Sequence, residues 1–150
     1  MQVKKCGSSY LIRLEIGEEV VASLGSFVRE RKIRSGWLQG IGAIDQVTVG
    51  TYDIKHRRYV KKTFAGDQEL LNMTGNIAWL GRDPVLHIHA LIADQSHKVS
   101  GGHLFSGRTC VTVEVVVQPW TVRVTRAPDA GTGLNLLKLS GHRRRPVVST

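Results

Sequence analysis

The pattern of apolar and polar positions predicts an opening strand that is followed by one helix. Residues 9–16 alternate in polarity, and their apolar face consists of Tyr10, Ile12, Leu14 and Ile16. Residues 18–34 change to a helical period, with one apolar stripe made of Val20, Val21, Leu24, Phe27 and Val28. Acidic residues begin this segment and basic residues end it, which is the charge order that a helix dipole favours. We therefore expect one main α-helix, bounded by Gly17 and Gly36.

Almost every segment after the predicted helix has the composition of β-structure. The expected strands are 37–43, 46–53, 57–64, 69–80, 85–93, 108–117 and 121–126. Residues 85–93 are nearly continuous apolar sequence apart from their histidines, and residues 81–84 form a turn before them. One helix with about seven strands predicts a single α+β domain with a largely antiparallel sheet.

Composition and cysteine content agree with one globular domain. The chain has 150 residues, of which 41% are hydrophobic. No apolar run approaches the ~20 residues of a membrane span, and no signal peptide is recognisable, so we expect a cytoplasmic protein with no membrane partner. Cys6 and Cys110 provide neither a disulfide framework nor metal-ligand spacing, and we expect inert thiols. We assign residues 1–139 to the domain and residues 140–150 to a basic flexible tail.

The net charge of +9 raises the question of a polyanionic partner such as DNA. Arg143, Arg144 and Arg145 form a basic run in the predicted tail and are candidate nucleic-acid contacts. The cluster in 29–34 has a simpler explanation as the basic end of the helix. The cluster in 55–62 fits an edge strand, where lysine discourages unwanted strand pairing. The charge therefore leaves a nucleic-acid role open.

Three histidines between positions 87 and 103 form the strongest candidate site. Residues two apart on a strand point to the same face, so His87 and His89 can converge on one ion while Ile88 faces the core. His103 follows a segment of hairpin length, and the next strand can return it beside the pair. Gly101 and Gly102 precede it and remove side chains where a loop would pass close to the site. Three neutral imidazoles with an open fourth position suit zinc or a similar divalent ion.

The chemistry of such a site stays open at this point. The ion could activate a water for hydrolysis, or it could be structural. Glu114 is the one candidate for a catalytic base, a further ligand or a neighbour of the metal, and the alternative is a salt bridge to Arg108 or Arg123. The sequence lacks the motifs of serine hydrolases, phosphate loops and dinucleotide-binding domains. The question of enzymatic activity is therefore left open.

An ordered set of motifs resembles the PPC domain, which is named for its occurrence in plants and prokaryotes. The motifs are Gly40–Ile44, Val47–Tyr52, Glu69–Asn76, Leu86–Ala90, Gly101–Leu104 and Val111–Val115, and the resemblance runs from about Tyr10 to Leu137. In plants this domain accompanies AT-hook motifs in nuclear proteins. In prokaryotes it is a free-standing protein, and this chain looks like that form.

The resemblance implies a homotrimer of single-helix, antiparallel-sheet domains. It also implies that His87, His89 and His103 match the histidines that bind a metal, usually taken as zinc, in prokaryotic members. The AT-hook core Arg-Gly-Arg-Pro is absent, and residues 143–146 match it only in part because they lack the glycine. DNA binding therefore does not follow from the fold. The leading hypothesis is a trimeric, zinc-like metal-binding PPC protein of unassigned role. The alternative is a DNA-binding or DNA-associated regulatory protein.

Overall fold

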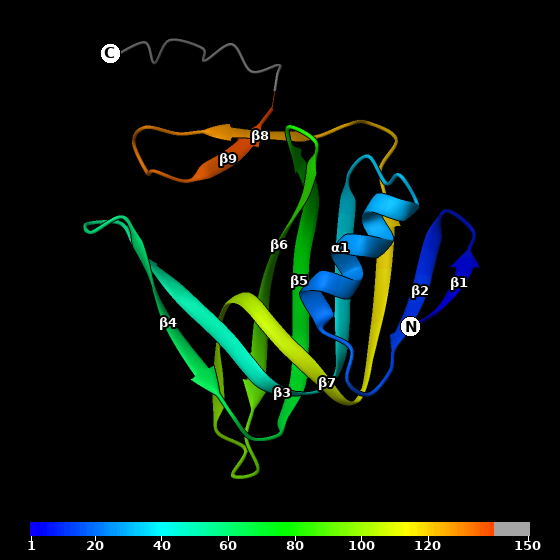
Figure 1. The fold of residues 1–150 in the computed structure, drawn as a ribbon, viewed down its shortest axis with the longest axis vertical. Helices are drawn as coiled ribbons and strands as arrows, with labels where there is room; N and C mark the ends of the chain where they lie inside the picture. The colour runs from blue at the N-terminus through cyan, green and yellow to red at the C-terminus, as the bar shows by residue number, and fades with distance from the viewer. Residues whose placement is uncertain (140–150) are drawn as a thin grey trace, which may run out of the picture.

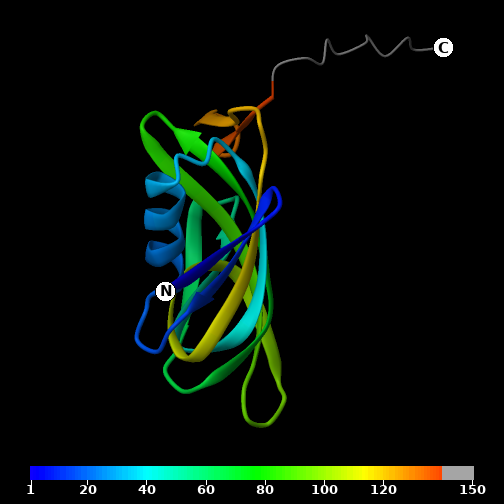
Figure 2. The same ribbon diagram turned by 90° about the vertical axis from the view of Figure 1, so that its right-hand side faces the viewer.

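The computed structural model describes residues 1–139 as one helix and nine strands. The helix is α1 (Val20–Glu30), and the strands are β1 (Gln2–Cys6), β2 (Ser9–Leu14), β3 (Gly36–Asp53), β4 (Arg58–Phe64), β5 (Gln68–Leu80), β6 (Asp83–Ala93), β7 (Val99–Pro119), β8 (Thr125–Pro128) and β9 (Asn135–Lys138). All nine strands belong to one sheet, and every pair is antiparallel except a parallel bridge between Trp79 and Thr125. The predicted α+β class is confirmed (Figures 1 and 2). The predicted basic tail, with Arg143, Arg144 and Arg145, lies outside the described residues.

Two long bent strands organise the sheet. β3 has 18 residues and joins two segments that the sequence pattern predicted as separate strands, while β7 has 21 residues and begins well before the predicted position 108. Their pairing register shifts between Gly42 and Ile44 and again between Asp45 and Thr48. Such irregularities bend a strand and increase its twist. Because of the bends, one half of β7 pairs with β2 while the other half pairs with β6.

The core lies between α1 and one face of this sheet. The helix contributes its predicted apolar stripe, of which Leu24, Phe27 and Val28 are at most 1% exposed. Their strand partners are inward-facing residues such as Ile12 and Val115. The helix is shorter than predicted at both ends: Glu19 caps its first turn, and a left-handed residue, Lys32, follows its last turn. Its eleven residues are too few to cross a bilayer.

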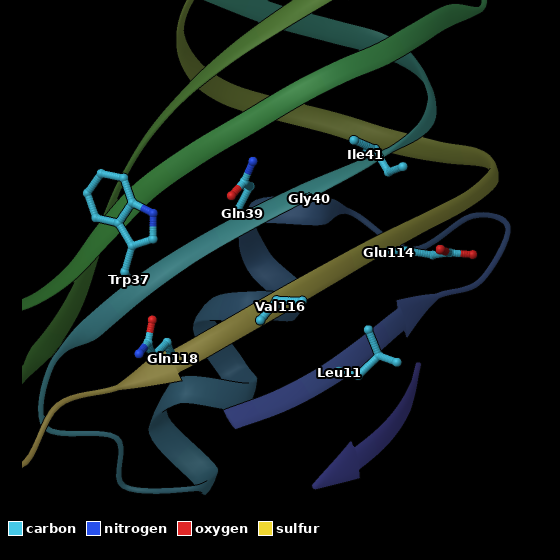
Figure 3. A pocket seen from close by; sticks show the side chains of 8 residues that line it. All are labelled: Leu11, Trp37, Gln39, Gly40, Ile41, Glu114, Val116 and Gln118. Atoms are coloured by element: carbon cyan, nitrogen blue, oxygen red, sulfur yellow. The ribbon is translucent and has the colours of Figure 1, made fainter. Parts of the chain in front are cut away.

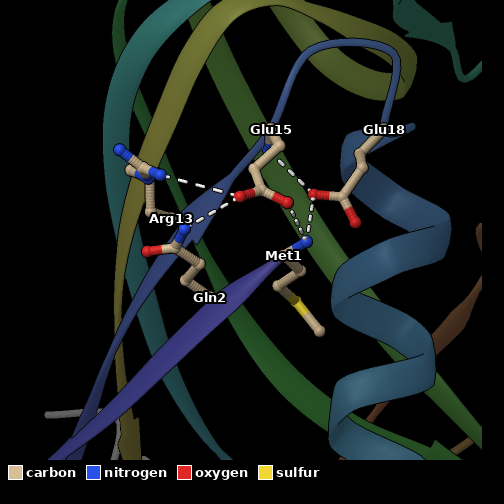
Figure 4. Close-up of polar contacts among 5 residues, drawn as sticks. All are labelled: Met1, Gln2, Arg13, Glu15 and Glu18. Carbon is tan, nitrogen blue, oxygen red and sulfur yellow. Dashed lines mark hydrogen bonds and ion pairs between the residues drawn. The ribbon is translucent and has the colours of Figure 1, made fainter.

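Strand β1 was not predicted, because only one of its apolar residues points toward the core and the strand therefore shows no alternating pattern. β1 pairs with β2, and polar contacts hold its start. The Met1 ammonium group lies 3.1 Å from the carboxylate of Glu15 and 2.8 Å from that of Glu18, and Gln2 donates a hydrogen bond to Glu15 (Figure 4). At the other end, the strand predicted over 121–126 was wrong in part, because regular structure begins only at Thr125.

Candidate metal centre

The pairing of β6 with β7 brings the three predicted histidines together. His89 lies directly opposite His103 in the antiparallel ladder, and His87 precedes His89 by two residues on the same face. The ring centroids of His87 and His103 are 5.2 Å apart, those of His87 and His89 are 5.0 Å apart, and those of His89 and His103 are 5.8 Å apart. One nitrogen of each ring lies within 4.8 Å of the other two. Their role as metal ligands stays a prediction.

The protonation state of these histidines suits the binding of a divalent cation. His103 Nδ1 is buried and has no hydrogen-bond partner within residues 1–139. Burial lowers the pKa of His87, and it lowers the pKa of His103 to about 4. Both rings are therefore neutral near pH 7, which is the form that binds a metal ion. Within the described part of the chain, the cluster consists of these three imidazoles without a fourth protein ligand, as in open zinc sites.

Two glycines permit the backbones to approach closely behind the histidines. A Cβ atom on Gly75 of β5 would lie 2.2 Å from the carbonyl oxygen of His87, and one on Gly102 of β7 would lie 2.8 Å from the carbonyl oxygen of Gly50. Both distances are too short for any side chain. Gly102, predicted to lie beside a loop, lies inside β7, where it brings that strand against β3.

Aromatic and cationic side chains surround the histidines. The ring centroids of Tyr59 and Phe105 lie 5.2 Å and 4.7 Å from that of His103. Lys61 extends over the ring of Phe105, with its Nζ atom 3.8 Å from the centroid. On the side of His87, the guanidinium group of Arg126 donates a hydrogen bond of 2.7 Å to the side-chain oxygen of Asn76. The site therefore combines an aromatic wall, formed by Tyr59 and Phe105, with the positive charges of Lys61 and Arg126.

Asn76 and Arg126 are neighbours of the site that were not predicted from the sequence. Asn76 lies opposite His87 in the β5–β6 ladder, and the register set by the predicted turn at 81–84 could have identified it. Arg126 belongs to β8, which reaches β5 from a distant part of the sequence. No local pattern marks that contact.

Glu114 is not brought to the histidines. It lies eleven residues beyond His103 on β7, where its side chain is exposed at a separate pocket of about 410 Å³ (Figure 3). Neither predicted salt bridge forms: Arg108 makes a two-bond ion pair with Asp45, and Arg123 donates to the carbonyl oxygen of Gly81. The geometry therefore gives Glu114 no contact with the candidate metal centre.

Comparisons with known proteins agree with this arrangement. The family model of the Plants and Prokaryotes Conserved (PCC) domain, which is the PPC domain, matches residues 1–121. A solved "putative DNA-binding protein" from Bacteroides thetaiotaomicron is 32% identical, with a TM-score of 0.89 over 91% of this chain and 96% of that one. A solved metal-containing protein from Archaeoglobus fulgidus is 34% identical, with a TM-score of 0.82 over 92% of this chain and 96% of that one.

Two further relatives extend the comparison. A PPC protein from Pyrococcus horikoshii shares the fold at 23% identity, with a TM-score of 0.82 over 94% of this chain and 96% of that one. The bifunctional protein GlmU of a Synechococcus strain is 27% identical over 127 residues. Those residues are 83% of this chain but 19% of GlmU, so the chain spans about a fifth of that protein.

Proposed function

Since this chain belongs to the Plants and Prokaryotes Conserved domain family, we propose that it is a homotrimeric protein that binds one zinc-like ion per protomer through His87, His89 and His103. The observation that carries the proposal is the convergence of three imidazole nitrogens within 4.8 Å of one another. A similar protein of 34% identity is metal-containing, which supports the same reading. An all-imidazole ligand set suits zinc better than calcium or magnesium, which prefer oxygen ligands.

The residues of the chain determine what such a site can do. When bound, the ion would supply Lewis acidity at its open coordination position. The half-buried His87 and His103 stay neutral at pH 7, and the ring of His103 packs against Tyr59 and Phe105. His89 is exposed and is the third proposed ligand, on the solvent side of the cluster. No carboxylate of residues 1–139 joins this set, so a general base from the protein is not part of the proposal.

The first prediction concerns metal content. Protein purified without a histidine tag should contain about one zinc or similar ion per protomer, measured by elemental analysis. The double variant His87→Ala/His89→Ala should lose this ion, because a single imidazole cannot retain it. His97→Asn is the matched control: His97 is exposed in the β6–β7 turn with a left-handed backbone, which asparagine tolerates, and this variant should keep its metal. Full metal retention in the double variant would refute the ligand assignment.

An apolar surface supports the trimer. Leu11, Ile41 and Val116 are 46%, 55% and 47% exposed, and with Trp37 they line the pocket shown in Figure 3. They lie on the face of the sheet away from α1, which appears behind the strands in that view. Exposed apolar patches of this kind mark interaction surfaces. We assign this surface, called the Trp37 face below, to contacts between copies of the chain.

A second candidate function is association with DNA. β4 pairs only with β3 among the described strands, and it exposes Arg58, Lys61 and Lys62, with Lys55 and Arg57 in the turn before it. This basic edge would meet phosphates without reading a sequence. One of the similar solved structures carries a DNA-binding description, which favours the same alternative.

The DNA alternative predicts binding that weakens steeply with salt. Lys55→Ala/Arg58→Ala should reduce affinity for duplex DNA several-fold and lower the salt dependence, because it removes two phosphate contacts. The control Lys4→Ala/Lys5→Ala removes the same charge from the exposed β1 and should leave affinity nearly unchanged. Truncation after Leu139 tests Arg143, Arg144 and Arg145 separately. Absence of a mobility shift at low salt would remove this function from consideration.

A further inference from the structure

Arg126 lies beside the candidate metal centre and has no counterion among residues 1–139. Its Nη2 atom donates to the side-chain oxygen of Asn76 at 2.7 Å, and its Nη1 atom donates to the carbonyl oxygen of Asn135 at 2.9 Å. Both acceptors are uncharged. Asn76 lies directly opposite His87 in the β5–β6 ladder, and paired residues point to the same face of a sheet. The guanidinium group therefore lies on the histidine face.

One buried donor of this side chain has no partner in the part of the chain that the structure describes. Arg126 Nε is buried and has no hydrogen-bond partner among the described residues. No ion pair involves Arg126 in residues 1–139, and burial lowers its pKa. A half-buried charge that lacks an opposite charge is costly to the fold, because it loses hydration without gaining a partner. A half-buried charge with an unpartnered donor is therefore a candidate for binding a charged ligand.

The hairpin that carries Arg126 is fixed in place by the opposite side of the site. The hydroxyl of Tyr52 donates to the carbonyl oxygen of Thr132 at 2.7 Å, and Arg57 reaches the carbonyl oxygen of Gly131 at 3.4 Å. Tyr52 in turn packs edge-on against Tyr59, with centroids 5.0 Å apart. These contacts link the β8–β9 loop to the aromatic wall of the histidine cluster. The position of Arg126 is therefore determined by the fold.

The electrostatics of the site also call for an anion. Lys61 adds a second positive charge near the cluster: its Nζ atom lies 3.8 Å from the ring centroid of Phe105, and that centroid lies 4.7 Å from the one of His103. A divalent ion on neutral imidazoles would add two further positive charges. No carboxylate of residues 1–139 joins the histidine cluster to balance them. An oxyanion is the ligand that such a set of charges binds best.

We propose that Arg126 is the anion-recognition residue of this centre and that the ligand of the centre is a small molecule with a carboxylate or phosphate group. This inference rests on the proposed function, because the anion would lie between the open metal position and the guanidinium group. The rings of Tyr59 and Phe105 would contact the uncharged part of the same molecule.

The test uses cobalt-substituted protein, in which visible absorption reports ligands at the metal. Acetate and inorganic phosphate should each change the spectrum in a saturable manner, and the comparison between them decides which oxyanion the site prefers. Acetamide, which is neutral and has the same shape as acetate, should have no such effect at equal concentration. The variant Arg126→Met should keep its cobalt but bind the preferred anion at least ~10-fold more weakly, as for the loss of a charged hydrogen bond. Equal affinity in this variant would overturn the proposal.

Two further variants keep the test decisive. Asn76→Asp supplies a carboxylate to Arg126 inside the fold, so it should stay folded, retain its cobalt and lose anion affinity to a similar extent. Arg123→Met is the control, because Arg123 lies over the ring of Trp79 and outside the site, and anion binding should not change. Metal content and anion-induced thermal stabilisation of the metal-free protein are measured in parallel. Wild-type protein without metal would refute the proposed function, whereas full metal content without any response to anions would refute only the role of Arg126.

Discussion

Among the histidines of residues 1–139, His103 has the most strongly lowered pKa. Its ring lies between the aromatic wall and the other two imidazoles, and burial lowers its pKa to about 4. In the unfolded chain the same group titrates near 6.5. Between these values the unfolded chain binds a proton that the folded chain does not bind. The free energy of unfolding therefore decreases as the pH falls from about 6.5 toward 4.

This difference predicts the pH dependence of the metal-free protein. In the presence of a chelator, wild-type protein should lose more stability between pH 7 and pH 5 than His103→Gln does. The difference between the two losses should be about 1 kcal/mol, which allows for the partial exposure of the ring. Urea denaturation at the two pH values measures both free energies. Parallel pH dependences in the two proteins would show that His103 titrates alike in the folded and unfolded states.

At the scale of elements, the site depends on how closely β5 and β6 approach each other. Gly75 occupies the point of contact, opposite Ile88 and behind the backbone of His87. Any side chain at this position would push the two strands apart. The distance between His87 and His103 would then change, since His87 moves with β6.

Gly75→Ala should therefore destabilise the protein by about 2–4 kcal/mol and weaken metal binding, because backbone atoms cannot make room for the added methyl group. Gly25→Ala is the matched control: a Cβ on Gly25 has no heavy atom within 4 Å, and alanine there should stabilise α1 by up to about 1 kcal/mol. Thermal unfolding of both variants, with metal analysis, distinguishes these outcomes. A wild-type melting temperature in Gly75→Ala would contradict the close packing.

The strands and the histidine face were predictable because alternation determines which side chains point inward. Ile88 is fully buried, as predicted, between the outward-pointing His87 and His89. The continuity of β3 was not predictable, since its bends depend on local backbone conformations such as the left-handed one at Gln46. A hydrophobic pattern records burial and not the path of the backbone.

The surroundings of the histidines were predictable only in part. Local hairpin register relates Asn76 to His87, and a turn between two strands is visible in the sequence. Arg126 reaches the site through the β8–β9 hairpin, and Glu114 lies far along a bent strand from His103. Both positions follow from tertiary packing, which a single sequence does not encode in its local pattern.

At the scale of the whole molecule, one row of residues connects the Trp37 face with the candidate metal centre. Cross-strand partners run from Leu11 through Val116, Gln39 and Thr74 to His89, each pair on adjacent strands. Partners in such a row point to the same face of the sheet. The surface that we assign to assembly and the candidate metal centre therefore share the face away from α1.

Ile41→Asp should dissociate the proposed trimer, because it introduces a charge into the Trp37 face that would be buried between protomers. Sedimentation analysis should find a monomer with wild-type metal content, since all three histidines belong to one protomer. Ile54→Asp is the control, because Ile54 is also exposed but lies in the β3–β4 turn. A trimer that survives Ile41→Asp would place the interface elsewhere, and a wild-type monomer would refute the assembly.

The three histidines occupy outward positions on strands whose inward positions build the core. Exchanging them for other polar residues would leave the buried Ile88, Ala90 and Leu104 in place, so we expect the fold to persist without the histidines. A few substitutions would therefore be enough to create or remove the proposed metal site while the scaffold persists. In a chain of this architecture, the outward residues of β6 and β7 would therefore show whether the proposed site is present, whereas the inward residues would not.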